Sequence, residues 1–303
     1  MSRALAIIRY LSLKALASSI LQAFGVLWLV VEISSFFSPQ FSTAVKSFWW
    51  LFVAIGIAAG FYRAWPRLSV SARVQGTDCT ITIQVRDMFS LKNVAFVIGS
   101  NTTFDTALDD GTIAETSVQG QAAKRFYGGA VNRLDEDIVR SLASIPSQAI
   151  TKPYGKQVAY PIGTVACVSA AQARLYLVAI AALNEHRVAQ SSRKNVTDAL
   201  PLLWESIRTR GGLDSLAVPV LGSGLSRIDA TREEIIREII RSFIPAIRAG
   251  NFCRSMAVVV SPADFTAGHV NLQELGAFMH HECMYGSSAS AGALVAPVGT
   301  PQR

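Results

Sequence analysis

Residues Ser215-Leu-Ala-Val-Pro-Val-Leu-Gly-Ser-Gly-Leu-Ser-Arg-Ile-Asp229 decide the fold that we predict for this chain. Their first part, Leu216–Leu221, is a short apolar run of the kind found in buried strands. The run ends at Gly222-Ser223-Gly224, and an amphipathic segment, Thr231–Arg248, follows. The order is therefore strand, glycine loop, helix. Such a loop leaves backbone N–H groups free beside a helix start, where a phosphate group can bind, although a plain tight turn has the same signature.

Strands and helices alternate on both sides of this stretch. We expect further strands at Thr80–Arg86, Val94–Ile98, Val158–Ala159, Val165–Val168 and Met256–Ser261, and helices at Ala122–Phe126, Asp135–Ala143, Val196–Thr209 and Leu272–His281. Ala171–Glu185 contains the apolar run Leu175–Ala182, and we expect a strand that leads into a helix. Several strands are apolar throughout, which predicts a three-layer α/β/α sandwich around a central sheet.

Three polar or glycine-rich positions directly follow predicted strands. Asp87 ends the first strand, Asn101 follows the second, and the Gly222–Gly224 loop follows a later one. In open α/β sheets, ligands bind beyond the carboxyl ends of the strands. The sequence therefore predicts that these three positions share one pocket.

The first seventy-five residues differ in composition from the rest of the chain. Ala15–Phe37 carries a single charge, at Glu32, and a second apolar helix is expected over residues 46–65. About 20 residues cross a bilayer core, so the first run is long enough and the second only just so. We therefore predict a transmembrane helical hairpin in residues 1–75, a soluble domain in residues 76–285 and a disordered tail in residues 286–303.

The distribution of charge orients this hairpin. Arg3, Arg9 and Lys14 precede the first helix, while Arg63 and Arg67 follow the second. The positive-inside rule then places the N-terminus and the soluble domain in the cytoplasm. It also explains the net charge of +7 better than nucleic-acid binding does. A cleaved signal peptide is the rival interpretation, but no convincing cleavage site follows the first run.

Two features of the hairpin point beyond a passive anchor, which stays the alternative. Gly56 and Gly60 form a G-x-x-x-G motif, which lets two helix backbones approach closely. Gln22 and Glu32 are polar groups within or near the first span, where such groups are costly and often mark contacts or pores. Glu32 has an interfacial position as its simpler explanation.

The order of these motifs resembles the macro domain, the ADP-ribose-binding fold. Asp87 stands at the family's strand-end Asp, Ile98-Gly-Ser-Asn101 stands in place of its Asn-Ala-Ala-Asn motif, and Pro219-Val-Leu-Gly-Ser-Gly-Leu225 is similar to its diphosphate loop. The family's glycine run after the Asn motif is absent. Its place is taken by Asn101-Thr-Thr-Phe-Asp-Thr106 and Ser117-Val-Gln-Gly-Gln121. With the two-helix N-terminus, these segments more closely resemble the macro-domain effectors of the Thoeris bacterial anti-phage systems.

The resemblance implies a function. A partner TIR-domain enzyme makes an ADP-ribose derivative from NAD, with a histidine conjugate as one candidate, and the macro domain binds it. The transmembrane helices of several copies then assemble and disrupt the bacterial inner membrane, which aborts the infection. The implied ligand-binding residues are Asp87 for adenine, Gly222, Ser223, Gly224 and Leu225 for the diphosphate, and Asn101, Thr103, Phe104, Gln119, Gly120 and Gln121 for the distal ribose and its substituent. Phe104 either stacks on the ligand or packs in the core, and the core is the slightly favoured position.

No catalytic or metal-ligating set stands out in the sequence. The four cysteines lie far apart, which argues against a disulfide scaffold and fits a reducing compartment. His280-His281-x-Cys283 has no second cluster that would complete a metal site. We therefore predict a binding protein without cofactor, metal or nucleic-acid partner. A membrane-tethered ADP-ribose-processing hydrolase and a nucleotide sensor with a passive anchor remain open.

Overall fold

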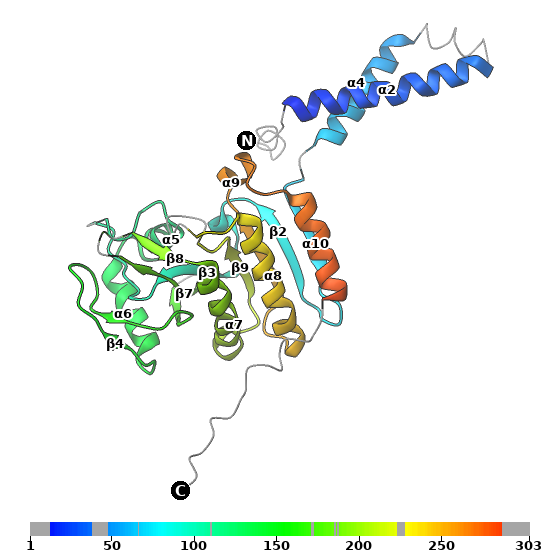
Figure 1. Ribbon diagram of the computed structural model, residues 1–303. Helices are drawn as coiled ribbons and strands as arrows, with labels where there is room; N and C mark the ends of the chain where they lie inside the picture. Colours follow the sequence, from blue (N-terminus) through cyan, green and yellow to red (C-terminus); the bar gives the residue numbers. More distant parts are fainter. Residues whose placement is uncertain are drawn as a thin grey trace. The chain divides into compact units, whose positions relative to one another are not determined.

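The computed structural model of the chain describes residues 13–37, 48–65, 67–109, 111–170, 173–184, 186, 188–222 and 228–286. The chain divides into two compact units, Met1–Arg67 and Leu68–Arg303 (Figure 1). The predicted boundary at residue 75 lies inside the second unit, because Ser69–Arg73 already forms a strand of its sheet. The predicted disordered tail lies outside the described residues, apart from Gly286.

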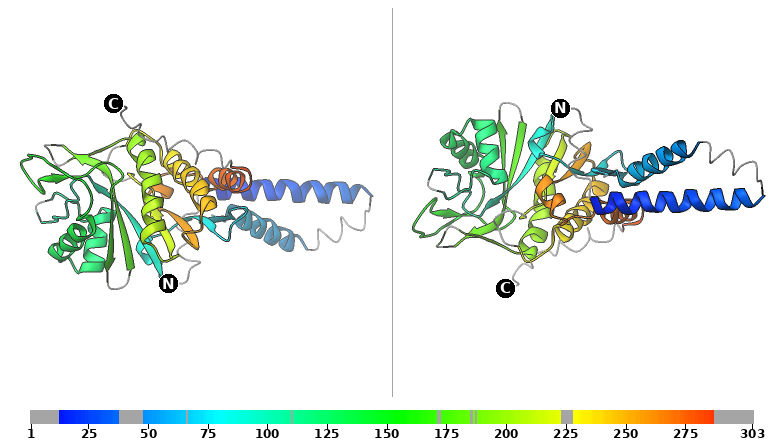
Figure 2. Two further views of the ribbon diagram at one scale, coloured as in Figure 1. Left: turned by 90° about the horizontal axis from the view of Figure 1, so that it is seen from below. Right: turned by 90° about the horizontal axis from the view of Figure 1, so that it is seen from above.

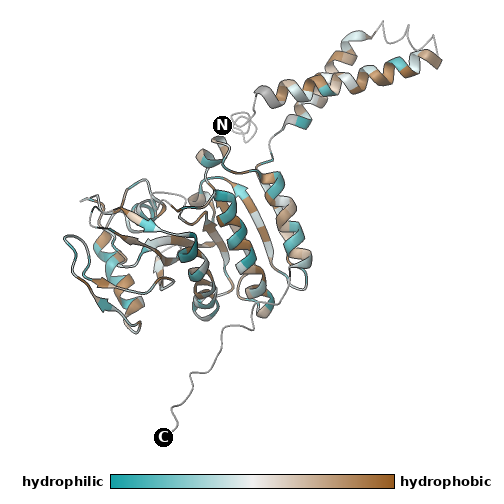
Figure 3. Ribbon diagram, in the orientation of Figure 1, coloured by the Kyte–Doolittle hydropathy of each residue, from teal (hydrophilic) through white to brown (hydrophobic). Residues whose placement is uncertain are grey.

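The first unit is a pair of helices, α2 (Leu13–Phe37) and α4 (Trp49–Ala64), which lie side by side (Figure 2). Both are apolar around most of their circumference (Figure 3). Within the described residues, one helix is long and apolar enough to cross a membrane, over Leu16–Phe37, while the apolar part of α4, Trp49–Arg63, is shorter. The structure therefore supplies one candidate span where the sequence predicted two.

A pair of glycines brings the two helices into close contact. A Cβ atom on Gly60 would lie 2.8 Å from the Cα atom of Ile20, and one on Gly56 would lie 2.7 Å from the ring of Phe24. These contacts also show that the two helices run antiparallel. The later glycine, Gly60, lies against the earlier residue, Ile20, and Gly56 lies against Phe24. The G-x-x-x-G motif thus packs against α2 of its own chain.

The second unit is built on one mixed sheet with the strand order β1-β2-β10-β9-β3-β7-β6, and β8 also pairs with β7. Its strands are β1 (Ser69–Arg73), β2 (Thr80–Val85), β3 (Val94–Asn101), β6 (Val165–Ala170), β7 (Ala173–Leu183), β8 (Ala189–Ser191), β9 (Ser215–Pro219) and β10 (Ser255–Val260). Along the sheet, the neighbouring strands β2, β10, β9, β3 and β7 all run parallel, so their carboxyl ends share one edge. The strands β1, β6 and β8 pair antiparallel with their neighbours.

Helices cover both faces of this sheet. They are α5 (Val118–Tyr127), α6 (Val131–Leu142), α7 (Arg193–Arg210), α8 (Arg232–Ala249), the short α9 (Pro262–Thr266) and α10 (Leu272–Tyr285). Residues of α7, α8 and α10 share one hydrophobic core with the sheet, and residues of α5 and α6 share a second core. The predicted three-layer α/β fold is therefore confirmed. A 3₁₀ turn, η1 (Met88–Ser90), and a small separate sheet of β4 (Gln148–Ala149) and β5 (Val158–Ala159) complete the unit.

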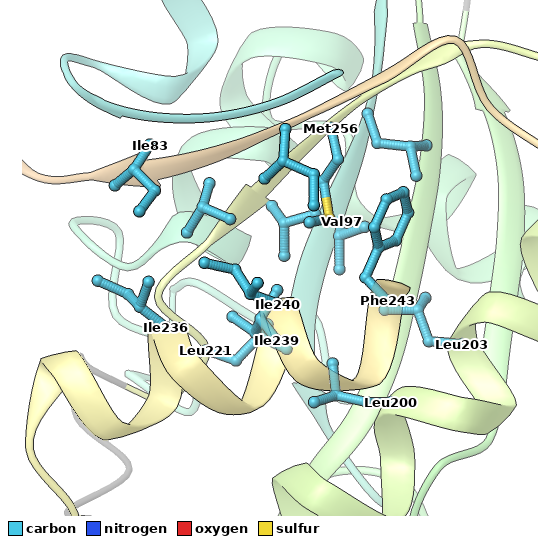
Figure 4. Close-up of a cluster of buried hydrophobic side chains, with 14 of the residues drawn as sticks. Ile83, Val97, Leu200, Leu203, Leu221, Ile236, Ile239, Ile240, Phe243 and Met256 are labelled. Atoms are coloured by element: carbon cyan, nitrogen blue, oxygen red, sulfur yellow. The ribbon is translucent and has the colours of Figure 1, made fainter. Parts of the chain in front are cut away.

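Helix α8 illustrates how the sequence specifies these layers. Ile236, Ile239, Ile240 and Phe243 recur at helical spacing and point from α8 toward the sheet (Figure 4). At its start, Thr231 forms a capping box: its hydroxyl accepts from the N–H of Glu234 at 3.2 Å, while the Glu234 carboxylate accepts from the Thr231 N–H at 2.8 Å. The helix begins where the sequence predicted.

One predicted element is wrong. Ala173–Leu183 is a single strand, β7, whereas we expected a strand that turns into a helix over Ala171–Glu185. The strand lies between β3 and β6 and is buried on both faces, so it needs an unbroken apolar run and shows no alternation. A short apolar run of this kind does not distinguish strand from helix by periodicity.

We predict that Phe243→Ala lowers the free energy of unfolding by about 3–5 kcal/mol, because it opens a cavity in the larger core. The Phe243 ring is fully buried, and its centroid lies 5.2 Å from that of Trp204 and 5.6 Å from that of Phe252. The measurement is denaturant unfolding of the detergent-solubilised chain, followed by circular dichroism. The matched control is Val139→Ala on the exposed face of α6, with an expected change within about 0.5 kcal/mol. Equal losses in both variants would contradict this prediction.

Candidate ligand-binding site

A cavity of about 490 Å³ opens at the carboxyl ends of β3, β7 and β9. The ends of these strands, the start of β8, and the segment that leads into α5 form its walls. The lining residues are Gly99, Ser100, Asn101, Thr112, Ile113, Ala114, Thr116, Ser117, Val118, Gln119, Ile180, Ala181, Leu183, Val188, Ala189, Pro219, Val220, Leu221 and Gly222. The cavity thus lies at the sheet edge where parallel α/β sheets bind their ligands.

The predicted ligand-binding residues divide into three groups. Asn101, Gln119 and Gly222 line the cavity. The other residues of the glycine loop, Ser223, Gly224 and Leu225, lie outside the described residues. The third group, made up of Asp87, Thr103, Phe104, Gly120 and Gln121, is described but does not line the cavity.

Each member of the third group has another contact. Asp87 is exposed and accepts a hydrogen bond from the N–H of Phe89 at 3.1 Å, which starts the 3₁₀ turn. Phe104 is buried in the core, and its ring packs edge-on against Tyr160. Gly120 is wedged against the carbonyl oxygen of Ala114, and Gln121 donates its side-chain N–H to the carbonyl oxygen of Thr116.

The described lining residues include no charged side chain. A bound anion would therefore depend on backbone N–H groups and hydroxyls. The first turn of α5 supplies such groups, since Ser117 caps this helix by accepting from the N–H of Gly120 at 3.0 Å. The N–H groups at a helix start lack partners within the helix and lie at the positive end of its dipole.

Asn101 presents its amide nitrogen to the cavity. Its Oδ1 accepts two backbone hydrogen bonds, from the N–H of Thr103 and from the N–H of Asp105, each at 3.1 Å. Two N–H donors converge on this atom, so it must be the oxygen. The described residues offer no partner to the Nδ2 group, which is left as a donor for a ligand.

Gln119 and Ser100 add two more polar groups to the same wall. The Nε2 group of Gln119 donates to the carbonyl oxygen of Asp105 at 2.6 Å, which leaves its Oε1 as an acceptor. The hydroxyl of Ser100 is buried and has no hydrogen-bond partner among the described residues. A buried polar group without a partner costs free energy unless a ligand or water pairs with it.

The buried carboxylate of Asp105 holds this wall in place. Its Oδ2 accepts from the Nζ of Lys152 at 2.6 Å and from the hydroxyl of Thr103, while its Oδ1 accepts from the N–H of Lys156 at 2.7 Å. A Cβ atom on Gly155 would lie 2.3 Å from Oδ1, so only glycine fits beside the carboxylate. This centre has no signature in the sequence, because Lys152 and Lys156 are about fifty residues away along the chain and no local pattern joins them to Asp105.

Gly222 begins the glycine loop in a conformation that favours glycine. Its φ angle is +69°, and a Cβ atom on it would lie 1.9 Å from Cδ1 of Ile228. The Ile228 side chain therefore packs against Gly222 at a distance that only glycine allows.

The groups with shifted pKa values lie away from the cavity lining. Burial raises the pKa of Tyr176 to about 12 and that of Cys283 to about 11, so both side chains stay neutral at physiological pH. All four cysteines are free. His280 and His281 are exposed whereas Cys283 is buried, so these three side chains do not converge on one point.

Comparisons with known proteins agree on one family. The model of the family "Thoeris protein ThsA, Macro domain" matches residues 81–261, which is more than half of the chain. The Thoeris protein ThsA of Bacillus amyloliquefaciens (strain Y2) is 27% identical over 163 residues, which cover 52% of this chain and 53% of that protein. The match thus spans about half the length of that relative.

Solved structures with a related arrangement are distant in sequence. A macrodomain of Oceanobacillus iheyensis with ADP has a TM-score of 0.49 and 12% identity, and the match covers 71% of this chain and 98% of that one. The Thermosipho africanus DarTG structure in complex with ADP-ribose has a TM-score of 0.40 and 14% identity, with 69% and 47% covered.

We predict that Asp105→Asn lowers the free energy of unfolding by about 3–5 kcal/mol, because it leaves the buried ammonium of Lys152 without its counter-charge. The measurement is again denaturant unfolding of the full chain. Asp198→Asn is the control, since it removes a carboxylate from an exposed pair with Lys194 and should change the free energy by less than about 1 kcal/mol. If the two variants unfold alike, Asp105 does not have the structural role described here.

Proposed function

The chain belongs to the Thoeris ThsA macro-domain family, and on that premise we propose that its cavity binds an ADP-ribose-derived signal. The observation that carries this proposal is the uncharged cavity at the shared strand edge, with free donors and acceptors on one wall. Its volume lies within the range of small-molecule sites. The names of the relatives point the same way, since one solved structure holds ADP and another holds ADP-ribose.

We place the diphosphate between the glycine loop and the start of α5. Gly222 turns the chain there, and the next residues, Ser223, Gly224 and Leu225, would offer their N–H groups. The first turn of α5 faces the same cavity. Backbone N–H groups and a helix dipole bind phosphate without a basic side chain, which suits an uncharged cavity.

The two ends of the ligand would then lie on either side. Asn101, Gln119 and Ser100 are placed to bind the hydroxyls of the distal ribose and its substituent. Asp87 follows β2, whose carboxyl end lies at the same edge two strands from β9, and its Oδ2 is the group proposed for the adenine amine.

We propose a sensor in preference to a hydrolase. The described cavity lining contains no carboxylate, imidazole, thiol or amine that would act as general base or nucleophile. Histidine-conjugated ADP-ribose is one candidate signal, made from NAD by a TIR-domain partner. Release of ADP-ribose from an ADP-ribosylated protein by the purified chain would favour the hydrolase.

For the response, we propose that the α2–α4 hairpin holds the chain in the bacterial inner membrane and disrupts it on activation. Support comes from the candidate span in α2 and from the apolar circumference of both helices. The signal acts only if it binds the assembled state more tightly than the idle state. In this scheme the macro domain lies in the cytoplasm, and disruption of the membrane kills the infected cell.

We predict that Ser100→Ala weakens binding of ADP-ribose or its histidine conjugate by about threefold to tenfold, the loss expected for one hydrogen bond. Stability should stay equal or rise, because the removed hydroxyl has no partner in the free chain. Isothermal titration calorimetry and thermal unfolding measure the two effects. Ser206→Ala is the matched control, since this hydroxyl is also buried and without a partner but does not line the cavity. Unchanged affinity in Ser100→Ala would remove this residue from the site.

For the membrane part, we expect dye release from vesicles that contain the full chain when an ADP-ribose derivative is added. A chain in which unrelated apolar helices replace α2 and α4 should bind the ligand equally and release no dye. Release without ligand would contradict the gating, and release from the chimera would favour a passive anchor.

A further inference from the structure

One face of α2 carries three polar residues and one glycine, together with a single leucine. Ser18, Gln22, Gly25, Leu29 and Glu32 are all exposed and recur at alternating intervals of four and three. This spacing keeps them on one side of a helix, as at the seam of a coiled coil. We refer to these five residues as the polar stripe.

The centre of the polar stripe, at Gln22, faces away from α4. Ile20 and Phe24 are the α2 residues that lie beneath the two glycines of α4. At 100° per residue, Gln22 projects about 160° from both of them. The glycine pair of α4 is therefore already used within the chain, while a Cβ atom on Gly25 of the stripe would meet nothing within 4 Å.

A lipid environment leaves this stripe unsatisfied. Gln22 donates from Nε2 to the hydroxyl of Ser18 at 3.3 Å, and the described residues offer no partner to its Oε1. The residue lies well inside the candidate span Leu16–Phe37. Lipid tails supply no hydrogen bonds, so an amide in this position is costly unless another helix pairs with it.

The chemistry of the stripe fits a second copy of itself. A glutamine amide both donates and accepts, so two Gln22 side chains related by a two-fold axis satisfy each other. A Cβ atom on Gly25 would have nothing within 4 Å, so a second backbone can approach closely there. We propose that the polar stripe of α2 is the surface through which two copies of this chain pack together in the membrane. This inference rests on the membrane part of the proposed function.

The test uses cysteine cross-linking of the full chain in membranes. Leu29 and Val30 are adjacent and similarly exposed, at 61% and 52%, but only Leu29 belongs to the stripe. With a mild oxidant, Leu29→Cys should give disulfide-linked homodimers above the background set by the native cysteines, and Val30→Cys should not. Adding Gln22→Leu to Leu29→Cys should lower the homodimer yield by about threefold to thirtyfold, the range for one interhelical hydrogen-bonded pair.

Three results would overturn the proposal. Equal cross-linking from both positions would place the contact elsewhere, and a homodimer yield insensitive to Gln22→Leu would remove the amide from it. Adducts of Leu29→Cys with a different protein and no homodimer would replace the second copy by that protein. These three results leave the proposed membrane function intact, because they are obtained with a chain that is in the membrane. Absence of the chain from the membrane fraction would contradict both the membrane function and the packing of two copies through the stripe. Calorimetry on the same preparation tests ligand binding in the cavity separately.

Discussion

The carboxylate of Asp105 is the group on which the geometry of the cavity depends. It lies in the core behind the cavity wall, where it is paired with Lys152 and bonded to the N–H of Lys156. A buried charge is tolerable only when it is paired and hydrogen-bonded, and here Lys152 and Lys156 of the β4–β5 loop and the hydroxyl of Thr103 supply the donors. The backbone N–H of Asp105 donates to Asn101 and its carbonyl oxygen accepts from Gln119, so the amides of Asn101 and Gln119 each have one end fixed and one end free. The wall is thereby ordered before any ligand arrives, which lowers the entropic cost of binding.

This arrangement explains how a cavity without charge is suited to an anion. Cationic side chains would need long, flexible stems, and Lys152 and Lys156 are already engaged by Asp105, Asp135 and the carbonyl oxygen of Phe104. Backbone N–H groups are fixed by the fold and need no counter-charge. The parallel strands bring Gly222 after β9 and Asn101 at the end of β3 to one edge, next to the start of α5. The proposed signal would thus be recognised by shape and oriented dipoles.

The hairpin shows a similar division between used and unused surfaces. Gly56 and Gly60 already pack closely against α2 of the same chain. The G-x-x-x-G motif, which often mediates association between helices, is therefore not available to a helix of another copy. The opposite side of α2 carries the amide of Gln22 within a largely apolar surface. An assembly that uses this side would leave the hairpin intact while copies come together, which is what a switch between idle and assembled states requires.

The sequence by itself determined the order of elements, the alternation of strands and helices, the start of α8 and the placement of Asp87, Asn101 and Gly222 at or after strand ends. These features follow from side-chain periodicity and local backbone preferences, which act over a few residues. Only the tertiary structure decided that β7 stays a strand throughout, that Phe104 turns into the core, that Asp105 pairs with Lys152 and that the glycines of α4 meet α2. Each of these features depends on partners many residues away along the chain. A local sequence pattern does not indicate which distant residues will pack against it.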